Sequence, residues 1–334
     1  MIPLPKPGQK LQFTYEVKGL PGLPMTFIGG LDAAGPTVLI AAGVHGGEYA
    51  AILTLVELAR ELQPSMLQGR LMMIHPLNTQ GFWERRATVL PEDGRNINSL
   101  FAVRGLSNPF PAETFKQPPN CGGVLPLRGC EGGYKGPAGL IAEIAAGLQA
   151  ASDFYLDLHA ADLFETTGPL VCYPATGSAA VTEASRKAAA MVDAPVMIKS
   201  TLAGAGITEA ARRGLPALLI KRGGHGGACL RAEVELYKKD VRNVLAHLGL
   251  LNQPPSAPLN PPEEIEPFYL RAKCQGLWMA AEAIGQKVKA GQTLGAITDF
   301  FGEPLETLAA EKDGRILYGL AALSVKAGDV LLVY

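Results

Sequence analysis

The sequence has few cysteines, no excess of charge of either sign and no long apolar run. Its five cysteines are odd in number and widely spaced, which favours reduced thiols in a cytoplasm over a disulfide framework, with a Cys121–Cys130 bridge as the alternative. The net charge of -1 gives no basis for a nucleic-acid or anionic-membrane partner. No segment has the length of a membrane span, and the first ten residues lack the apolar core of a signal peptide. We therefore expect a cytoplasmic protein.

The 334 residues are 48% hydrophobic, enough for one large domain and a small one. Short apolar strands alternate with segments of helical period over most of the chain. Strands are expected at 37–40, 71–74, 154–158, 170–173, 196–199 and 217–220, edge strands at 11–17 and 25–28, and helices at 49–63, 179–192, 208–213 and 232–250. This alternation predicts an α/β fold with a mostly parallel sheet that is covered by helices on both faces.

A proline-rich segment, Asn252–Pro262, indicates a boundary between domains 1–252 and 263–334. Beyond it, Val288–Leu294 and Val325–Leu331 share the pattern V-K-A-G-x-x-L. Two hairpin-like halves with the same turn indicate a small β-sandwich of the biotinyl/lipoyl type. No lysine occupies an obvious hairpin tip, so we expect a packed accessory domain rather than a carrier.

The segment Ala41–Glu48 places an imidazole and a carboxylate directly after the apolar strand 37–40. His45 and Glu48 are three residues apart, and the glycines between them allow the backbone to fold tightly enough for both side chains to face one object. Because the pair follows the carboxyl end of a strand, it indicates half of a metal site.

A third ligand is expected from the end of another strand. His159 closes the strand 154–158, and Asp157 points to the same side, where it could hold a ring nitrogen or line the site. The other histidines are weaker candidates: His75 is expected to be a hydrogen-bonded core residue, His247 lies in the last helix, and His225 lies in a glycine loop. Two nitrogens and one carboxylate leave an open position, which is the pattern of a catalytic zinc site with one ion per chain.

Together these motifs resemble the succinylglutamate desuccinylase/aspartoacylase family of zinc-carboxypeptidase-like hydrolases over nearly the whole chain. The matching segments are G-V-H-G-G-E at Gly43–Glu48, P-L-N at Pro76–Asn78, D-G-x-N-x-N at Asp93–Asn98, D-L-H at Asp157–His159 and G-L-P-A-L-L-I at Gly214–Ile220.

The resemblance implies a three-layer α/β/α zinc-peptidase-like domain followed by a barrel-sandwich-like β domain. It also implies that His45, Glu48 and His159 bind Zn²⁺. The expected reaction is hydrolysis of an amide, or sometimes an ester, in a small N-acyl amino acid or a related compound. Zinc activates a water and polarises the carbonyl, while a glutamate takes and returns the proton. Asp157 and Asn98 are expected to line the substrate site.

Two positions depart from the family pattern. Lys221 occupies the place of the proton-shuttling glutamate, just before Gly223 and Gly224, and Ser99 occupies the place of the arginine that grips a substrate carboxylate. Three explanations compete for the lysine. In the first explanation, Lys221 is itself the base, because burial and a nearby zinc ion favour its neutral form. In the second explanation, another carboxylate reaches into the site, with Glu209 as the first candidate and Glu131 as the second. In the third explanation, the protein has lost the hydrolytic activity and has retained metal or ligand binding.

Two arginines precede the D-G-x-N segment, where the family has one that stabilises the tetrahedral oxyanion. We assign Arg86 to catalysis and Arg85 to substrate binding. The gap to Asp93 is longer than in the family, so which arginine stabilises the oxyanion stays open, and two solvated loop residues are the alternative. The long 101–136 loop is expected to set access or specificity; it carries Arg128, Glu131, Tyr134 and Lys135.

These observations predict a zinc-dependent hydrolase of carbon–nitrogen bonds other than peptide bonds, with an altered small-molecule substrate. A catalytically silent member that binds a metal, a ligand or a partner subunit is the second hypothesis. A homo-oligomer is an open alternative.

Overall fold

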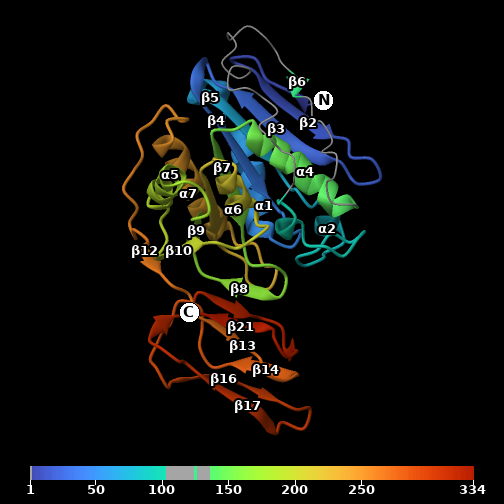
Figure 1. The fold of residues 1–334 in the computed structure, drawn as a ribbon, viewed down its shortest axis with the longest axis vertical. Helices are drawn as coiled ribbons and strands as arrows, with labels where there is room; N and C mark the ends of the chain where they lie inside the picture. Colours follow the sequence, from blue (N-terminus) through green and yellow to red (C-terminus); the bar gives the residue numbers. More distant parts are fainter. Residues whose placement is uncertain (1, 103–123, 126–135) are drawn as a thin grey trace.

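The computed structural model describes residues 2–102, 124–125 and 136–334. A large sheet flanked by helices forms one part of the molecule, and antiparallel β-structure forms the other (Figure 1). Six residues singled out above lie outside the described residues: Cys121, Cys130, Arg128, Glu131, Tyr134 and Lys135.

The central sheet has nine strands in the order β12-β10-β9-β11-β7-β4-β5-β3-β2. The strands are β2 (Lys10–Tyr15), β3 (Leu23–Gly29), β4 (Asp32–Ala42), β5 (Gln68–Ile74), β7 (Phe154–His159), β9 (Leu170–Pro174), β10 (Val196–Ser200), β11 (Ala217–Lys221) and β12 (Glu263–Ile265). Five of the eight neighbouring pairs are parallel. β2 and β3 form one antiparallel edge, and β11 runs antiparallel to β9. The mostly parallel sheet and the edge strand expected at 11–17 are therefore confirmed. The strand expected at 25–28 is not an edge strand, because β3 pairs with both β2 and β5.

Helices cover both faces of this sheet, as predicted for a three-layer fold. One face packs against α1 (Tyr49–Glu61), α5 (Ala179–Ala189) and α7 (Arg231–His247), and the other against α4 (Pro137–Ala150) and α6 (Gly206–Arg212). Within β7, Leu156 faces the first layer and Tyr155 the second, and both are fully buried. Burial on both faces explains why the central strands are apolar except near their carboxyl ends. Helix α4 was not predicted, because apolar residues occur on nearly all of its sides and obscure the helical period.

The remaining short elements connect these layers. They are β1 (Ile2–Pro3), which pairs with β6 (Val124–Leu125), the helix α2 (Thr79–Trp83), and the 3-10 turns η1 (Pro64–Met66) and η2 (Ile97–Ser99). Among the described residues, no helix combines the length and apolar character needed to cross a membrane.

The C-terminal part is antiparallel β-structure around its own apolar core. One sheet has the order β13-β21-β19-β8, a second β17-β16-β14-β20, and β15 pairs with β18. Their bounds are β8 (Glu165–Thr167), β13 (Tyr269–Arg271), β14 (Gly276–Ala280), β15 (Lys287–Val288), β16 (Thr293–Thr298), β17 (Pro304–Ala309), β18 (Gly314–Arg315), β19 (Tyr318–Leu320), β20 (Ser324–Val325) and β21 (Val330–Val333). In both repeats the glycine has a positive φ, 81° at Gly291 and 95° at Gly328, and the final leucines, Leu294 and Leu331, are fully buried. The repeat therefore encodes two equivalent turns.

Two strands cross the predicted domain limits. β12, which follows the proline-rich segment, pairs with β10 at the edge of the large sheet, whereas β8, from within the first domain, pairs with β19 of the C-terminal part. Each part therefore completes a sheet of the other, and β8 lies at the junction between them (Figure 1). The limits 1–252 and 263–334 themselves stay a prediction.

Candidate metal centre

The candidate ligands meet at one edge of the central sheet. β4 and β7 are neighbouring parallel strands, so their carboxyl ends lie side by side. His45 lies in the loop after β4, Glu48 is the residue before the first turn of α1, and His159 is the last residue of β7. The strand order therefore brings together residues that are 111 positions apart in the sequence.

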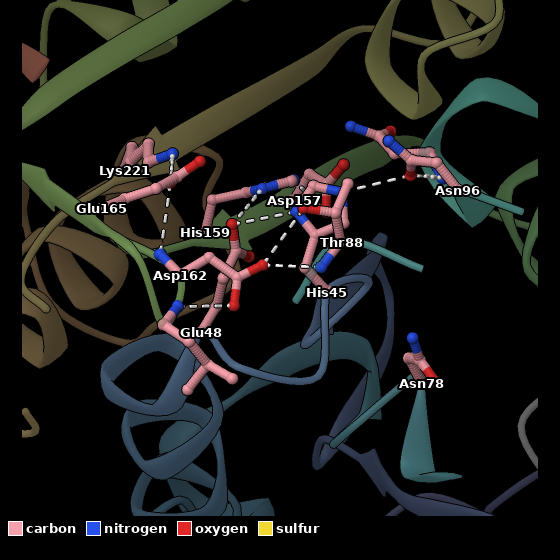
Figure 2. A network of polar contacts seen from close by, with 12 residues as sticks. His45, Glu48, Asn78, Thr88, Asn96, Asp157, His159, Asp162, Glu165 and Lys221 are labelled. Atoms are coloured by element: carbon pink, nitrogen blue, oxygen red, sulfur yellow. Dashed lines mark hydrogen bonds and ion pairs between the residues drawn. The ribbon is translucent and has the colours of Figure 1, made fainter. Parts of the chain in front are cut away.

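Their side chains converge on one point (Figure 2). Nδ1 of His45 and Nδ1 of His159 each lie 3.1 Å from Oε1 of Glu48. One ligand atom from each of the three residues lies within 4.8 Å of the others, a group that can hold a metal ion. Glu48 and His159 are buried, with 1% and 3% of their surface exposed, while His45 is partly exposed. The three residues predicted to be ligands are thus adjacent.

The chemistry of this cluster fits a divalent cation. Oε2 of Glu48 is buried and has no hydrogen-bond partner among the described residues. Burial alone would raise the pKa of Glu48, but the neighbouring charges of His159 and His45 outweigh it and lower the pKa. For His159 burial acts in the opposite direction and lowers the pKa, but the charges of Glu48 and Asp157 outweigh it and raise the pKa to about 10. The buried carboxylate therefore requires a positive charge beside it, which a metal ion can supply in place of the imidazolium proton.

The outer ring nitrogens lie beside two further residues. Nε2 of His45 lies 3.1 Å from Oδ1 of Asn96, which also accepts a hydrogen bond from the backbone N–H of Asn98, so that Nε2 is the nitrogen that donates. Nε2 of His159 lies 3.4 Å from Oδ1 of Asp157. The hydrogen bond to Asn96 orients the ring of His45 so that its Nδ1 faces the cluster. Nε2 of His159 and both carboxylate oxygens of Asp157 have no hydrogen-bond partner among the described residues, so the contact between these two residues is electrostatic. Asn96 was part of the D-G-x-N-x-N motif, but the sequence assigned it no role.

The glycines of the ligand loop allow its close packing. A Cβ on Gly46 would lie 2.2 Å from the backbone carbon of Gly81, and one on Gly47 would lie 1.9 Å from Oδ1 of Asp162. Oδ2 of Asp162 accepts a hydrogen bond from the backbone N–H of Thr88 at 2.7 Å. Asp162 therefore joins the His45 loop, the loop after β7 and the segment around Thr88.

The predicted substrate residues of the D-G-x-N-x-N segment make local contacts. Oδ1 of Asn98 accepts a hydrogen bond from the backbone N–H of Gly206, at the start of α6. Ser99 is exposed, and its hydroxyl donates to the backbone oxygen of Asn96 at 2.7 Å. Both residues adjoin Asn96, which contacts a candidate ligand. Their binding of a substrate stays a prediction, as does that of Asp157, whose carboxylate is buried beside His159.

The other predicted catalytic residues have described contacts outside the cluster. The carboxylate of Glu209 accepts the backbone N–H of Gly204 at 2.9 Å and pairs with Arg212. Arg85 is exposed, and the side chain of Arg86 is 63% exposed, with Nε 4.0 Å from Glu84. None of these described contacts reaches a candidate ligand, so the catalytic roles of Glu209, Arg85 and Arg86 stay predictions.

Lys221 lies beside a candidate ligand and pairs with a carboxylate. It is the register partner of His159 in the parallel pair β7–β11. Its Nζ lies 3.1 Å from Oε2 of Glu165 in β8 (Figure 2). Burial lowers the pKa of Lys221, but Glu165 and Glu48 raise it above the ordinary value. A lysine that acts as a general base must be neutral and therefore needs a lowered pKa, whereas the pKa of Lys221 is raised. Glu165 escaped the sequence analysis because it lies in a three-residue strand whose partner, β19, is far away in the sequence.

The remaining histidines have contacts of their own. Nε2 of His75 lies 3.0 Å from the hydroxyl of Thr26, and burial lowers its pKa to about 4. This is the hydrogen-bonded residue that was expected. His225 is exposed in a loop that forms an isolated bridge with Thr166, and His247 ends α7.

Comparison with known proteins gives consistent results. A model of the succinylglutamate desuccinylase/aspartoacylase catalytic domain matches residues 34–247. A curated relative, the N-alpha-acetyl-L-2,4-diaminobutyric acid deacetylase of Halomonas elongata, is 25% identical over 313 residues, covering 90% of this chain and 82% of the relative.

Solved structures share the fold. A succinylglutamate desuccinylase/aspartoacylase from Rhodobacter sphaeroides has a TM-score of 0.77 and 23% identity, over 97% of this chain and 94% of that one. The product-bound ectoine utilization protein EutE (DoeB) from Ruegeria pomeroyi has a TM-score of 0.76 and 21% identity, over 97% and 92%.

The family model and the curated relative both carry the names of hydrolases that act on carbon–nitrogen bonds other than peptide bonds. The matched region contains His45, Glu48, His159 and Lys221. It spans most of the described three-layer fold. The chain belongs to the succinylglutamate desuccinylase/aspartoacylase family.

Proposed function

We propose that the protein is a zinc-dependent deacylase that hydrolyses the amide bond of a small N-acyl amino acid. The observation that carries this proposal is the convergence of His45, Glu48 and His159, with Oε2 of Glu48 buried and without a hydrogen-bond partner among the described residues. Family membership supports the reaction class, and the curated deacetylase relative supports an acyl amino acid as substrate.

The three ligands would hold the ion through Nδ1 of each histidine and the carboxylate of Glu48. Zinc bound there supplies Lewis acidity for a water and for the substrate carbonyl. Asn96 holds a proton on Nε2 of His45 and orients that ring, and the carboxylate of Asp157 lies beside Nε2 of His159, where it favours a proton on that nitrogen. Lys221, held as a cation by Glu165, provides positive charge next to His159. Such a charge stabilises an oxyanion or binds a carboxylate.

A second candidate function is a silent member that binds a metal or a ligand without turnover. It is favoured by one observation, the lysine at position 221, because loss of a positioned general base costs on the order of 10²–10⁴ in rate.

Metal analysis combined with a panel of N-acyl amino acids and amides separates the two. We expect one zinc per chain and turnover that is lost on chelation and restored by zinc. Protein that binds no zinc, or zinc-loaded protein that turns over no member of the panel, would refute the deacylase proposal, and the second of these results would support the silent binder.

A further inference from the structure

A contact network around Lys221 joins the metal centre to the C-terminal part. Oε2 of Glu165 accepts hydrogen bonds from Nζ of Lys221 at 3.1 Å and from the backbone N–H of Asp162 at 3.2 Å. Oε1 of the same carboxylate accepts from the hydroxyl of Tyr318 at 3.3 Å. Nζ of Lys221 also lies 5.6 Å from the centre of the Tyr318 ring. Thus both oxygens of Glu165 are bonded, and two of its three donors are side chains.

The pairing of β8 with β19 holds this network in place. Glu165 and Tyr318 lie in β8 and β19, whose register pairs Glu165 with Leu320 and Thr167 with Tyr318. The hydroxyl of Thr167 donates to the backbone oxygen of Leu317 at 3.2 Å. The C-terminal part therefore contributes a side chain next to Glu165 and Lys221, through a β-ladder rather than through a surface contact.

Lys221 is placed to meet a ligand and is held in its charged form. Because Lys221 and His159 are register partners in parallel strands, their side chains leave the sheet on the same side. The side chains of Lys221 and Glu165 are 19% and 23% exposed, so the pair is not sealed in the core. The carboxylates that face the ammonium are Glu165, Glu48 and Asp162, and they raise its pKa against the effect of burial.

We propose that Lys221 binds the carboxylate of the substrate, and that Glu165 and Tyr318 are the residues that position it. The inference rests on the proposed function, because the acyl amino acid is the ligand whose carboxylate would be bound. The expected gripping position, Ser99, carries a short exposed hydroxyl that is already bonded to the backbone of Asn96. A lysine beside the metal ligands supplies the positive charge that this serine lacks.

The first test measures binding without turnover. The affinity of chelator-treated protein for N-acetyl-2,4-diaminobutyric acid and for its uncharged carboxamide is measured by calorimetry at pH 7.5. We expect the carboxylate to bind tighter by about 10-fold to 100-fold, as for hydrogen bonds to charged groups. This preference should disappear in Lys221→Met. Equal binding of the two compounds by the parent, or an unchanged preference in Lys221→Met, would overturn the proposal.

The second test addresses the positioning residues. Glu165→Gln removes a partner that raises the pKa of Lys221 while burial remains, so the carboxylate preference should be lost at a lower pH than in the parent. Adding Lys221→Arg to Glu165→Gln should restore the preference at high pH, because a guanidinium stays charged. Tyr318→Phe removes the donor to Oε1 of Glu165 and should weaken the carboxylate preference at pH 7.5 by less than Lys221→Met does. An unmoved profile in Glu165→Gln would refute the positioning role.

Matched controls come from another lysine–carboxylate pair and another tyrosine. Lys289 and Asp313 form an exposed pair at 2.6 Å in the C-terminal part, and Tyr269 is half-exposed. Lys289→Met, Asp313→Asn and Tyr269→Phe should leave the carboxylate preference and its pH profile unchanged. Zinc content and turnover are measured separately. Zinc-loaded protein without turnover refutes the deacylase proposal alone. A parent without a carboxylate preference, or a Lys221→Met variant that keeps the preference, refutes the role of Lys221 alone.

Discussion

Nε2 of His159 faces Oδ1 of Asp157 across 3.4 Å, two residues back along the same strand. Asp157 is buried, with 1% of its surface exposed, and its Oδ2 lies next to Gly206, where a Cβ would come within 3.1 Å. The carboxylate therefore lies between a candidate ligand and the start of α6, and neither of its oxygens has a hydrogen-bond partner among the described residues. This arrangement fits an orienting residue better than one that contacts the substrate.

The first prediction concerns these orienting contacts. Asp157→Asn and Asn96→Ala should each weaken zinc binding by about 10-fold to 100-fold, because the imidazole rings lose the partners of their outer nitrogens. Competition with a chromophoric chelator measures the affinity. His225→Gln, at an exposed histidine, is the control and should bind zinc like the parent. Parent-like affinity in both variants would show that the outer contacts do not support the metal.

The second prediction concerns position 221. Lys221→Glu should lower turnover of the native substrate by about 10-fold or more, because the charged donor to the substrate is lost and a carboxylate there repels Glu165 and the substrate. Zinc content, measured by metal analysis, should stay at one per chain. If the parent is inactive and the variant gains deacylase activity, the lysine silences the site and the second candidate function is correct.

The third prediction concerns His75 and acid stability. Its folded pKa of about 4 lies below the ordinary 6.5, so the unfolded chain binds a proton that the folded chain does not between these values. Stability should therefore fall as the pH drops through this window, by about 2 kcal/mol at pH 5 for this residue. Urea unfolding at pH 7.5 and pH 5 measures the difference. His75→Gln should show a smaller loss between the two pH values; an identical loss would contradict the assignment.

The fourth prediction concerns the buried ion pair between Arg222, the residue after Lys221, and Asp240. Nε of Arg222 donates to Oδ2 of Asp240 in α7 at 2.6 Å, and the side chains are 6% and 2% exposed. Arg222→Met leaves a buried carboxylate without its partner and should lower the free energy of unfolding by about 3–5 kcal/mol. Arg242→Met, at the more exposed pair with Glu61, should cost about 1 kcal/mol or less. Equal losses in the two variants would refute this difference.

Much of the fold was predictable because its signals are local. The strand ends at His45 and His159 follow apolar runs, and parallel strands end at a common edge, so the candidate ligands could be inferred from the sequence. The pairing of Asp157 with His159 also follows from the two-residue period of a strand. By contrast, Glu165 contacts Tyr318 only because β8 pairs with β19. No local sequence pattern predicts a contact between residues that are 153 positions apart. Helix α4 escaped because a helix buried on nearly all sides has no polar face.

The exchange of β8 and β12 between the two parts bears on how the protein comes apart. The segment between α7 and β12 is itself anchored: the side-chain amide of Asn252 donates to Ser65 O at 3.0 Å, and that of Asn260 to Oδ1 of Asp193 at 2.9 Å. Cleavage by a protease within this segment would therefore leave two fragments that stay associated through shared ladders. Such a nicked protein would melt in one cooperative transition and would keep Tyr318 against Glu165 and Lys221.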